Sequence, residues 1–215
     1  MSKKISVIIP VYNRETLIAR AINSCIDQTL NKSLFEIIVI NDGSTDKSKY
    51  EIEKFKKSIK YVEHKKNLGL PSARNTGIKN ALGRFIFNLD SDDYMHPKTL
   101  ETMLLGMELG NFDALACDYV ITDIEDNKSK PISSKKTPIA CGIMFKRQLL
   151  IDIGLFDEKL KIHEEKDLFI RFTKKYKITH FPVPFYRYFQ HEESLSRSKE
   201  SLKYLKKLKN KSYEI

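Results

Sequence analysis

The sequence has few cysteines and no long apolar run. Its three cysteines, Cys25, Cys117 and Cys141, lie far apart, make an odd number and include no Cys-x-x-Cys pair, so neither a disulfide framework nor a zinc knuckle is indicated. No run approaches the roughly 18 apolar residues of a membrane-spanning helix, and residues 1–4 lead directly into a strand rather than into a signal peptide. We therefore expect buried free thiols and a cytoplasmic protein.

Two further protein classes are disfavoured by motifs that the sequence lacks. A nucleotidyltransferase would need a Gly- and Lys-rich phosphate loop after the first strand, but residues 12–15 there are Tyr-Asn-Arg-Glu. The formal net charge of +10 alone would suit a nucleic-acid binder, yet no nucleic-acid recognition motif accompanies it, and we expect no such partner. An anionic lipid surface and acidic small molecules stay open as partners.

The composition and pattern that are present predict a single α/β domain. At 215 residues, with 41% hydrophobic and 31% charged residues, the chain is long enough for one well-buried core and short for two. In its first half, apolar runs of strand type alternate with segments of helical spacing, which predicts a parallel, right-handed wound sheet covered on both faces. The expected strands are 6–11, 35–40, 61–64 and 85–89, and the expected helices run from about 15 to 28, through 52 and 55, and from 71 to about 81.

The second half is less regular. We expect a helix from 97 to 110, a strand at 113–117, an exposed loop or strand-edge excursion at 123–137, an apolar stretch at 142–145, a helix at 147–153, and a helix through 168–173 that follows the charged residues 164–167. Residues 178–189 are strand-like but contain Pro182 and Pro184, which predicts a strand at the edge of the sheet.

An acidic turn follows the fourth expected strand. Asp90, Asp92 and Asp93 come directly after the apolar run 85–89. Carboxylates this close raise one another's pKa unless something positive lies among them, and a divalent cation is the commonest answer. Because Asp also caps helices and forms Asx-turns, the stretch alone leaves a metal–diphosphate site and a structural turn both open.

Polar residues also follow other strands of the predicted sheet. Since the carboxyl ends of parallel strands fall on one edge, Asn13, Asp42, the loop 67–74 and the acidic turn should converge on one cleft. Asp42 could accept hydrogen bonds from a nucleobase or a ribose there, or could serve only to cap a helix.

Arg74 lies at the end of that loop. Its guanidinium could bind a base or a diphosphate bidentately, or could pair with Asp92 or Asp93. Gly69 and Gly77 lie on either side of it; one could serve a turn and the other the close packing of a helix on the sheet.

Four motifs in this order resemble family 2 glycosyltransferases of the GT-A fold. They are 7–13 (Val-Ile-Ile-Pro-Val-Tyr-Asn), 39–46 (Val-Ile-Asn-Asp-Gly-Ser-Thr-Asp), 67–77 (with Asn-Leu-Gly and Ala-Arg-Asn-Thr-Gly) and 88–93 (Asn-Leu-Asp-Ser-Asp-Asp). The resemblance covers roughly residues 5 to 196. It implies a Rossmann-like, nucleotide-binding wound mixed sheet with an acceptor-binding half. It also implies transfer of a sugar with inversion, from a nucleotide sugar that we expect to be UDP-linked, to a saccharide or lipid-linked acceptor in surface polysaccharide synthesis.

The same resemblance assigns a donor site. It gives Asp42 to the nucleobase and Arg74 to the nucleotide. In its Asp-x-Asp motif, Asp92 is the direct ligand of Mn²⁺ or Mg²⁺, and Asp90 faces the ribose or the metal's water shell. The full expected donor-binding set is Pro10, Val11, Tyr12, Asn13, Asp42, Arg74, Asp90, Ser91 and Asp92. A divalent ion there would stabilise the charge that develops on the diphosphate leaving group.

Inversion also requires a base that takes the proton of the acceptor hydroxyl. Residues 164–171 resemble the family's Glu-Asp-x-Asp-Leu segment, which gives this role to Glu165, with Glu164 as the second candidate. Glu165 departs from the Asp that the family usually has at this place. Both acids could instead only favour a helix N-terminus electrostatically.

The last segments complete the expected organisation. His191 begins a stretch, 191–196, that resembles the family's His-x-x-Ser-x-Ser element, and it is either a third metal ligand or diphosphate contact, or a lone surface histidine. The basic tail, 197–215, sets leucines three apart among lysines and suits a solvated helix or contact with the inner face of an anionic membrane. We expect a nucleotide-sugar-binding half at 1–112 and an acceptor-binding, catalytic-base half at 113–196. The alternative function is a non-catalytic nucleotide-sugar-binding module.

Overall fold

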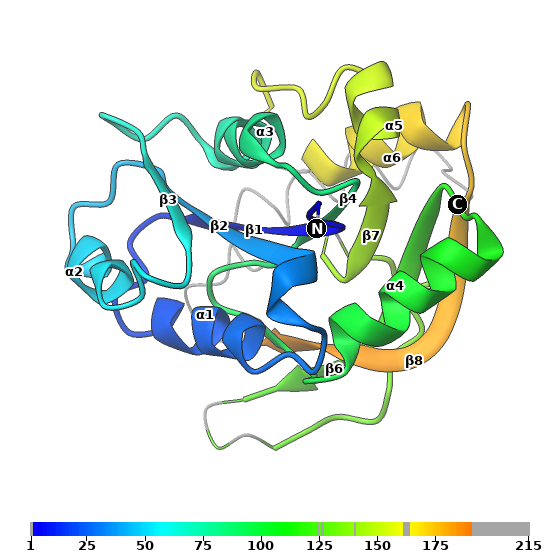
Figure 1. Ribbon diagram of the computed structural model, residues 1–215, viewed down its shortest axis with the longest axis horizontal. Coiled ribbons are helices and arrows are strands. Elements are labelled where there is room, and N and C mark those ends of the chain that lie inside the picture. The colour runs from blue at the N-terminus through cyan, green and yellow to red at the C-terminus, as the bar shows by residue number, and fades with distance from the viewer. Residues whose placement is uncertain (1, 124, 126, 140, 161–163, 191–215) are drawn as a thin grey trace, which may run out of the picture.

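One mixed sheet of eight strands runs through the molecule, with helices on both of its faces (Figure 1). The structure is a computed structural model, and it describes residues 2–123, 125, 127–139, 141–160 and 164–190. The strands are β1 (Ile5–Val11), β2 (Phe35–Asn41), β3 (Lys60–Glu63), β4 (Phe85–Asn88), β5 (Tyr94–Met95), β6 (Ala114–Thr122), β7 (Ile143–Lys146) and β8 (Ile178–Phe189). The helices are α1 (Ile18–Ile26), α2 (Ser48–Glu53), α3 (Leu70–Asn80), α4 (Thr99–Gly110), α5 (Arg147–Asp152) and α6 (Glu164–Thr173), with a short 3-10 helix η1 (Lys32–Leu34).

The first half of the chain forms the parallel part of the sheet, as its alternating pattern predicts. The strand order is β3-β2-β1-β4-β7-β6-β8-β5. β1 pairs in parallel with β2 and β4, and β2 pairs in parallel with β3. The carboxyl ends of β1, β2 and β4 therefore lie on one edge of the sheet, which is the edge where open α/β sheets bind ligands.

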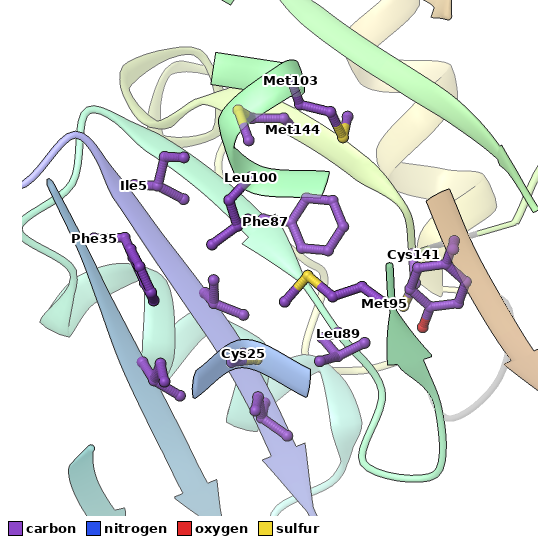
Figure 2. Close-up of a cluster of buried hydrophobic side chains, with 14 of the residues drawn as sticks. Ile5, Cys25, Phe35, Phe87, Leu89, Met95, Leu100, Met103, Cys141 and Met144 are labelled. Carbon is purple, nitrogen blue, oxygen red and sulfur yellow. The ribbon is translucent and has the colours of Figure 1, made fainter. Parts of the chain in front are cut away.

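The two faces of the sheet carry separate apolar clusters because successive side chains of a strand point to opposite sides. One cluster joins alternate residues of β1, β2 and β4 to α1 and α4, and Figure 2 shows Phe87, Leu89 and Met95 gathered with Cys25 of α1 and Leu100 of α4. The other joins the intervening strand residues to α3, α5 and α6. All three cysteines are free and buried, as expected.

The structure shows which of Gly69 and Gly77 serves the turn and which serves the close packing of a helix on the sheet. Gly69 precedes α3 with a φ of +95°, a conformation that favours glycine. Gly77 lies within α3, where an added Cβ would come within 2.4 Å of Ile8 Cγ2 and 2.9 Å of Ile40 Cδ1. The first glycine makes the turn, and the second lets α3 pack closely on the sheet.

The second half makes the sheet mixed. β7 is antiparallel to both β4 and β6, whereas β6 and β8 are parallel to each other. The polar segment after β6 behaves as a strand-edge excursion, because it forms isolated bridges between Tyr119 and Ile132 and between Thr122 and Lys128. β8 lies near the end of the sheet opposite β3; it is curved, and its C-terminal end lies beside α1 (Figure 1).

The prediction that 178–189 is an edge strand is wrong for its C-terminal part. There β5 flanks β8 through Tyr186 and Arg187, so β5 is the outer strand. The prolines are accommodated differently: Cys117 pairs with Phe181, but the next residue of β6 pairs with Pro184. This shift of register leaves Pro182, which has no N–H to donate, inside a bulge.

No helix in the described ranges is long and apolar enough to cross a membrane. The basic tail, 197–215, lies outside the described residues.

Candidate functional site

The acidic turn directly follows β4 at the ligand-binding edge, and its third carboxylate anchors it. Asp93 is buried; its Oδ2 accepts a hydrogen bond from the Tyr186 hydroxyl at 2.5 Å, and its Oδ1 accepts one from the Phe189 N–H at 2.8 Å. Burial, and then the neighbouring charges of Asp92 and Asp90, raise the pKa of Asp93 well above its usual range. Asp93 thus ties the turn to β8, whereas the side chains of Asp90 and Asp92 stay partly exposed.

Arg74 connects the acidic turn to α6. It comes from the first turns of α3, and its side chain is only 1% exposed. Nη2 donates to Asp90 Oδ1 at 2.8 Å, and Nη1 donates to Glu164 Oε1 at 2.7 Å. Burial opposes the charge of Arg74, but the carboxylates outweigh it and raise its pKa. The sequence left open a pairing with Asp92 or Asp93, whereas the structure pairs Arg74 with Asp90 and with an acid 90 residues further along the chain.

The two acids expected as candidate bases lie at the start of α6 but in different surroundings. The Glu164 side chain is 6% exposed and is ion-paired with Arg74. Burial raises the pKa of Glu164, and the Arg74 guanidinium only partly offsets this. Glu165 is half-buried. Glu164 is therefore held by Arg74, whereas Glu165 lies in a less buried position at the same end of α6.

Asp92 faces the segment that follows β1. Its Oδ2 lies 3.6 Å from Nε of Arg14, and its side chain is 20% exposed. The Asp92 carbonyl accepts a hydrogen bond from Nη2 of Arg20 at 2.7 Å. The Arg20 guanidinium lies between two rings, 4.7 Å from the centroid of Tyr94 and 4.1 Å from that of Phe189. Helix α1 and the end of β8 therefore hold the backbone of the turn.

Asp42 follows β2 and already has partners within the protein. Its Oδ1 lies 2.6 Å from His64 Nδ1 and accepts the Leu68 N–H, and its Oδ2 accepts the Gly69 N–H, both at 2.9 Å. It therefore fixes the loop that leads into α3. These N–H groups precede α3, so the contact resembles the helix capping that the sequence left open for Asp42. It differs in that the capped segment is distant in sequence.

The end of β1 completes the edge. Asn13 has a φ of +50°, its N–H donates to Ser44 Oγ at 3.1 Å, and its side-chain oxygen accepts the Thr45 N–H at 2.8 Å. Tyr12 is 43% exposed beside it. The remaining expected donor-site residues are buried at the same edge of the sheet; they are Pro10, Val11 and Ser91. The structure thus brings together the described part of the expected site.

Asp90 and Asp92 fit part of a divalent-cation site. Both are hard oxygen donors in the acidic turn, with 30% and 20% of their side chains exposed, although one oxygen of Asp90 is bound by Arg74. Mg²⁺ and similar ions are commonly held by one or two carboxylates together with substrate phosphates. No cluster of three or more His, Cys, Asp or Glu residues suited to a metal occurs in the described part of the chain. His191, the third expected ligand, lies outside it. The residues present therefore fit an ion that is shared with a diphosphate.

Two sets of contacts around the acidic turn were not predicted from the sequence. The Arg74–Glu164 pair joins segments 90 residues apart, and nothing local in either segment indicates it. Tyr186 and Phe189 gave only a strand pattern, which does not reveal that they hold Asp93. The pairing of an invariably charged guanidinium with a nearby acid could be guessed, but not which acid.

Comparison with known proteins agrees with this geometry. The sequence model for "Glycosyl transferase family 2" matches residues 6–192. A protein of Rickettsia bellii described as an uncharacterized glycosyltransferase is 38% identical over 186 residues, which are 80% of this chain and 26% of that protein. The poly(ribitol-phosphate) beta-N-acetylglucosaminyltransferase TarP of Staphylococcus aureus is 36% identical over 120 residues, covering 54% of this chain and 37% of TarP. This chain spans 26% to 62% of the length of the five Rickettsia relatives that it matches.

Solved structures share the fold. The crystal structure of S. aureus TarS 1-349 in complex with UDP-GlcNAc matches with a TM-score of 0.77 and 26% identity, over 91% of this chain and 61% of that one. The mannosyltransferase PcManGT of Pyrobaculum calidifontis, in complex with GDP-Man and Mn²⁺, matches with a TM-score of 0.73 and 18% identity, over 99% of this chain and 66% of that one. The expected GT-A fold is confirmed.

Proposed function

The chain belongs to glycosyl transferase family 2, and from this membership and the site we propose that it is an inverting, metal-dependent glycosyltransferase. It moves a sugar from a nucleotide sugar to a saccharide or lipid-linked acceptor. The observation that carries the proposal is the Arg74 bridge, which joins Asp90 of the acidic turn to Glu164 at the start of α6. The bridge supports one continuous site, in which residues 1–112 hold the donor and residues 113–196 supply the base and the acceptor surface.

The donor is a nucleoside diphosphate sugar, and UDP is the nucleotide that we propose. TarS, which is 26% identical, is described in complexes with UDP and with UDP-GlcNAc, and this supports a UDP-hexose or UDP-N-acetylhexosamine. A carboxylate has about four acceptor positions, of which Asp42 uses three within the protein. The fourth would accept an N–H of the base, while Tyr12 and Asn13 border it.

The charge of the leaving diphosphate is the main electrostatic demand on the site. Asp92, with Asp90 behind it, would hold Mn²⁺ or Mg²⁺ against the phosphates, and the bound ion would neutralise the charge that develops on the leaving group. Arg74 orients the Asp90 carboxylate through a charged hydrogen bond. Asp93, held by Tyr186, fixes the backbone that presents both ligands.

Inversion at the sugar is a single displacement, so the acceptor hydroxyl must lose its proton on the side opposite the diphosphate. Glu165 would accept that proton. Its neighbour Glu164, ion-paired with Arg74, sets the position of the helix that carries it. Glu in place of the family's Asp brings the carboxylate one methylene further from the helix, which lengthens its reach toward the acceptor.

The acceptor that we propose is a growing glycan of the cell surface. The support is that TarP, a relative over 54% of this chain, is described as acting on poly(ribitol-phosphate). The basic tail, 197–215, would bring the enzyme to an anionic membrane where such acceptors are assembled.

A donor panel tests the proposal. Transfer or slow hydrolysis would be measured with UDP-, GDP- and dTDP-sugars in the presence of Mn²⁺, and we expect turnover with a UDP-sugar. The proposal fails if no nucleotide sugar is turned over. If UDP then still binds, the chain is the non-catalytic binding module that the sequence left as the alternative.

A further inference from the structure

The segment 153–158, which follows α5, is sharply turned and precedes the helix that carries Glu164 and Glu165. Leu155 has a φ of +62° and Gly154 one of +87°. A leucine in this left-handed region of backbone conformation is strained, and such a conformation persists only where the surrounding structure holds it. The contacts that hold this segment therefore need an explanation.

Asn75 of α3 holds the middle of the segment. It is buried, its Oδ1 accepts the N–H of Phe156 at 3.0 Å, and its Nδ2 donates to the Phe156 carbonyl at 2.9 Å. One carboxamide thus satisfies both backbone groups of Phe156. Neither a carboxylate, which only accepts, nor an apolar side chain can make both hydrogen bonds.

The second N–H of the Asn75 amide is also used by this segment. Nδ2 donates to Glu158 Oε1 at 2.9 Å. This hydrogen bond is the main cause that lowers the pKa of the Glu158 carboxyl, so Glu158 is an ionised acceptor near neutral pH. The Asn75 side chain therefore directs both its donors and its acceptor at the segment 153–158.

Arg171, in the last turn of α6, holds the same segment from the other side. Its Nη1 donates to the Ile153 carbonyl at 2.5 Å, and its Nη2 donates to the Leu155 carbonyl at 2.7 Å. Asp167, one turn earlier in α6, accepts from Nε at 2.8 Å and from Nη2 at 2.6 Å. The planar guanidinium is thus fixed by its own helix, and it ties α6 to the turn at Leu155.

Two neighbouring residues of α3 therefore connect this helix to α6 by two routes, on the face of the sheet that both helices cover (Figure 1). Arg74 reaches Glu164, the first residue of α6, directly. Asn75 reaches Arg171, in the last turn, through the segment 153–158. The routes also touch, since Cζ of Arg74 lies 5.3 Å from the centroid of the Phe156 ring. Apolar packing is not directional, so directed polar contacts near both ends of α6 fix how the helix is oriented.

We propose that Asn75 and Arg171 are positioning residues for the base: by orienting α6 they place the Glu165 carboxylate at the acceptor hydroxyl. The inference rests on the proposed function, in which Glu165 accepts the proton. Neither positioning residue has to touch the donor or the acceptor. A displacement of about 1 Å in a reacting group can reduce a rate on the order of 10²-fold. Loss of either contact should therefore slow the transfer while the nucleotide still binds.

A double-mutant cycle on the transfer rate tests the proposal. Single-turnover transfer at saturating donor would be measured for N75A, E165Q and N75A/E165Q, and UDP affinity would be measured for each. We expect N75A to slow transfer about 10–100-fold with little change in UDP affinity. Because Asn75 acts through Glu165, the double variant should be about as slow as E165Q alone, instead of showing the product of the two effects.

A second variant reaches the same segment from α6. R171M keeps the apolar stem of the side chain and removes the donors to Ile153 and Leu155, so it should give the same pattern as N75A, and it takes the place of N75A if that variant does not fold. Two controls should keep the wild-type rate. N80A removes a carboxamide from α3 that donates to the Thr76 carbonyl within the helix, and K174M removes an exposed charge just after α6.

The outcomes separate this inference from the proposed function. If E165Q is slow but N75A and R171M transfer at the wild-type rate, or if their effects multiply with that of E165Q, the positioning role is overturned and the base stands. The same holds if both variants lose UDP affinity in proportion to their rates, because that indicates general damage to the site. An E165Q variant with the wild-type rate refutes the proposed base, and with it the positioning of Glu165. Melting curves show that each variant is folded at the assay temperature.

Discussion

At the scale of single residues, the site depends on a guanidinium that is buried together with its partners. Removing one member of a buried ion pair costs much more than removing an exposed one, because the remaining charge stays in a poor solvent. Arg74 has two such partners, Asp90 and Glu164. Arg74 therefore holds the acidic turn and the start of α6 together.

Substitution of Arg74 should be costly. We expect R74A to lower the free energy of unfolding by about 3–5 kcal/mol, as for other broken buried ion pairs. Lys79, on the same helix, is the matched control, because its pair with Glu158 at 3.9 Å is exposed and K79A should cost less than about 1 kcal/mol. Urea unfolding of both variants measures the difference, and equal losses would contradict the assignment.

Substitutions of Glu164 and Glu165 in α6 should have different effects on the transfer rate and on thermal stability. E165Q removes the proposed base and should reduce the transfer rate about 10²–10⁴-fold with little change in UDP affinity. E164Q keeps a hydrogen-bond acceptor for Arg74 but loses the charge, and it should lower thermal stability more than E165Q does. Single-turnover rates and melting curves decide the question. The reverse pattern would move the base to Glu164.

Asp93 gives a prediction about pH. Its pKa is raised in the folded protein by burial and by Asp92 and Asp90. A raised folded-state pKa means that this carboxyl favours folding most below its unfolded pKa, and that the benefit is lost as pH rises through the folded pKa. D93N is neutral at every pH. Its stability relative to the wild type should therefore increase as the pH rises from acidic to alkaline values. A constant difference in melting temperature between the two proteins from pH 5 to pH 8.5 would show that Asp93 does not titrate in this way.

At the scale of elements, local pattern was sufficient wherever an element's partners lie nearby in the chain. The order of strands and helices from β1 to β4, and then α4, follows from the period of the apolar residues, whereas β5 was not expected and the sequence left open which of Gly69 and Gly77 makes the turn. The parallel pairing of β6 with β8 and the placement of β5 outside β8 did not follow, because these strands meet across insertions of tens of residues. Long-range pairing leaves little trace in either strand alone.

The close packing of α3 on the sheet can be tested at Gly77. A methyl group there would meet Ile8 Cγ2 at 2.4 Å, and a β-branched side chain on a central strand has little freedom to move. We expect G77A to destabilise the protein by about 1–3 kcal/mol despite the better helix propensity of Ala. Gly106 in α4 is the control, since its added methyl would meet only the end of the Leu115 side chain, at 2.9 Å. Similar melting temperatures for G77A and G106A would rule out tight packing as the reason for Gly77.

At the scale of the whole molecule, buried polar contacts lock together the elements that surround the acidic turn. Asp42 fixes the loop before α3, Arg74 on α3 joins the acidic turn to α6, and Asp93 joins that turn to β8. The motifs of residues 7–93 were sufficient to predict which residues meet at the carboxyl ends of β1, β2 and β4. The long-range contacts of β8, β5 and the segment after β6 were not predictable in the same detail, because the sequences of these segments carry no comparable motif.

We propose that Asp90 and Asp92 share a divalent ion with the diphosphate of a bound nucleotide. Isothermal titration of UDP into the protein tests it most directly, with Mn²⁺, with EDTA, and with the variant D92A. D157A removes an exposed acid that is not among the expected site residues, and it is the control for loss of an acid. We predict that UDP binding is strong only with Mn²⁺, falls at least about tenfold in EDTA and in D92A, and is unchanged in D157A, because the ion offsets the repulsion between carboxylates and phosphates. UDP affinity that is the same with Mn²⁺, in EDTA and in D92A would contradict the claim.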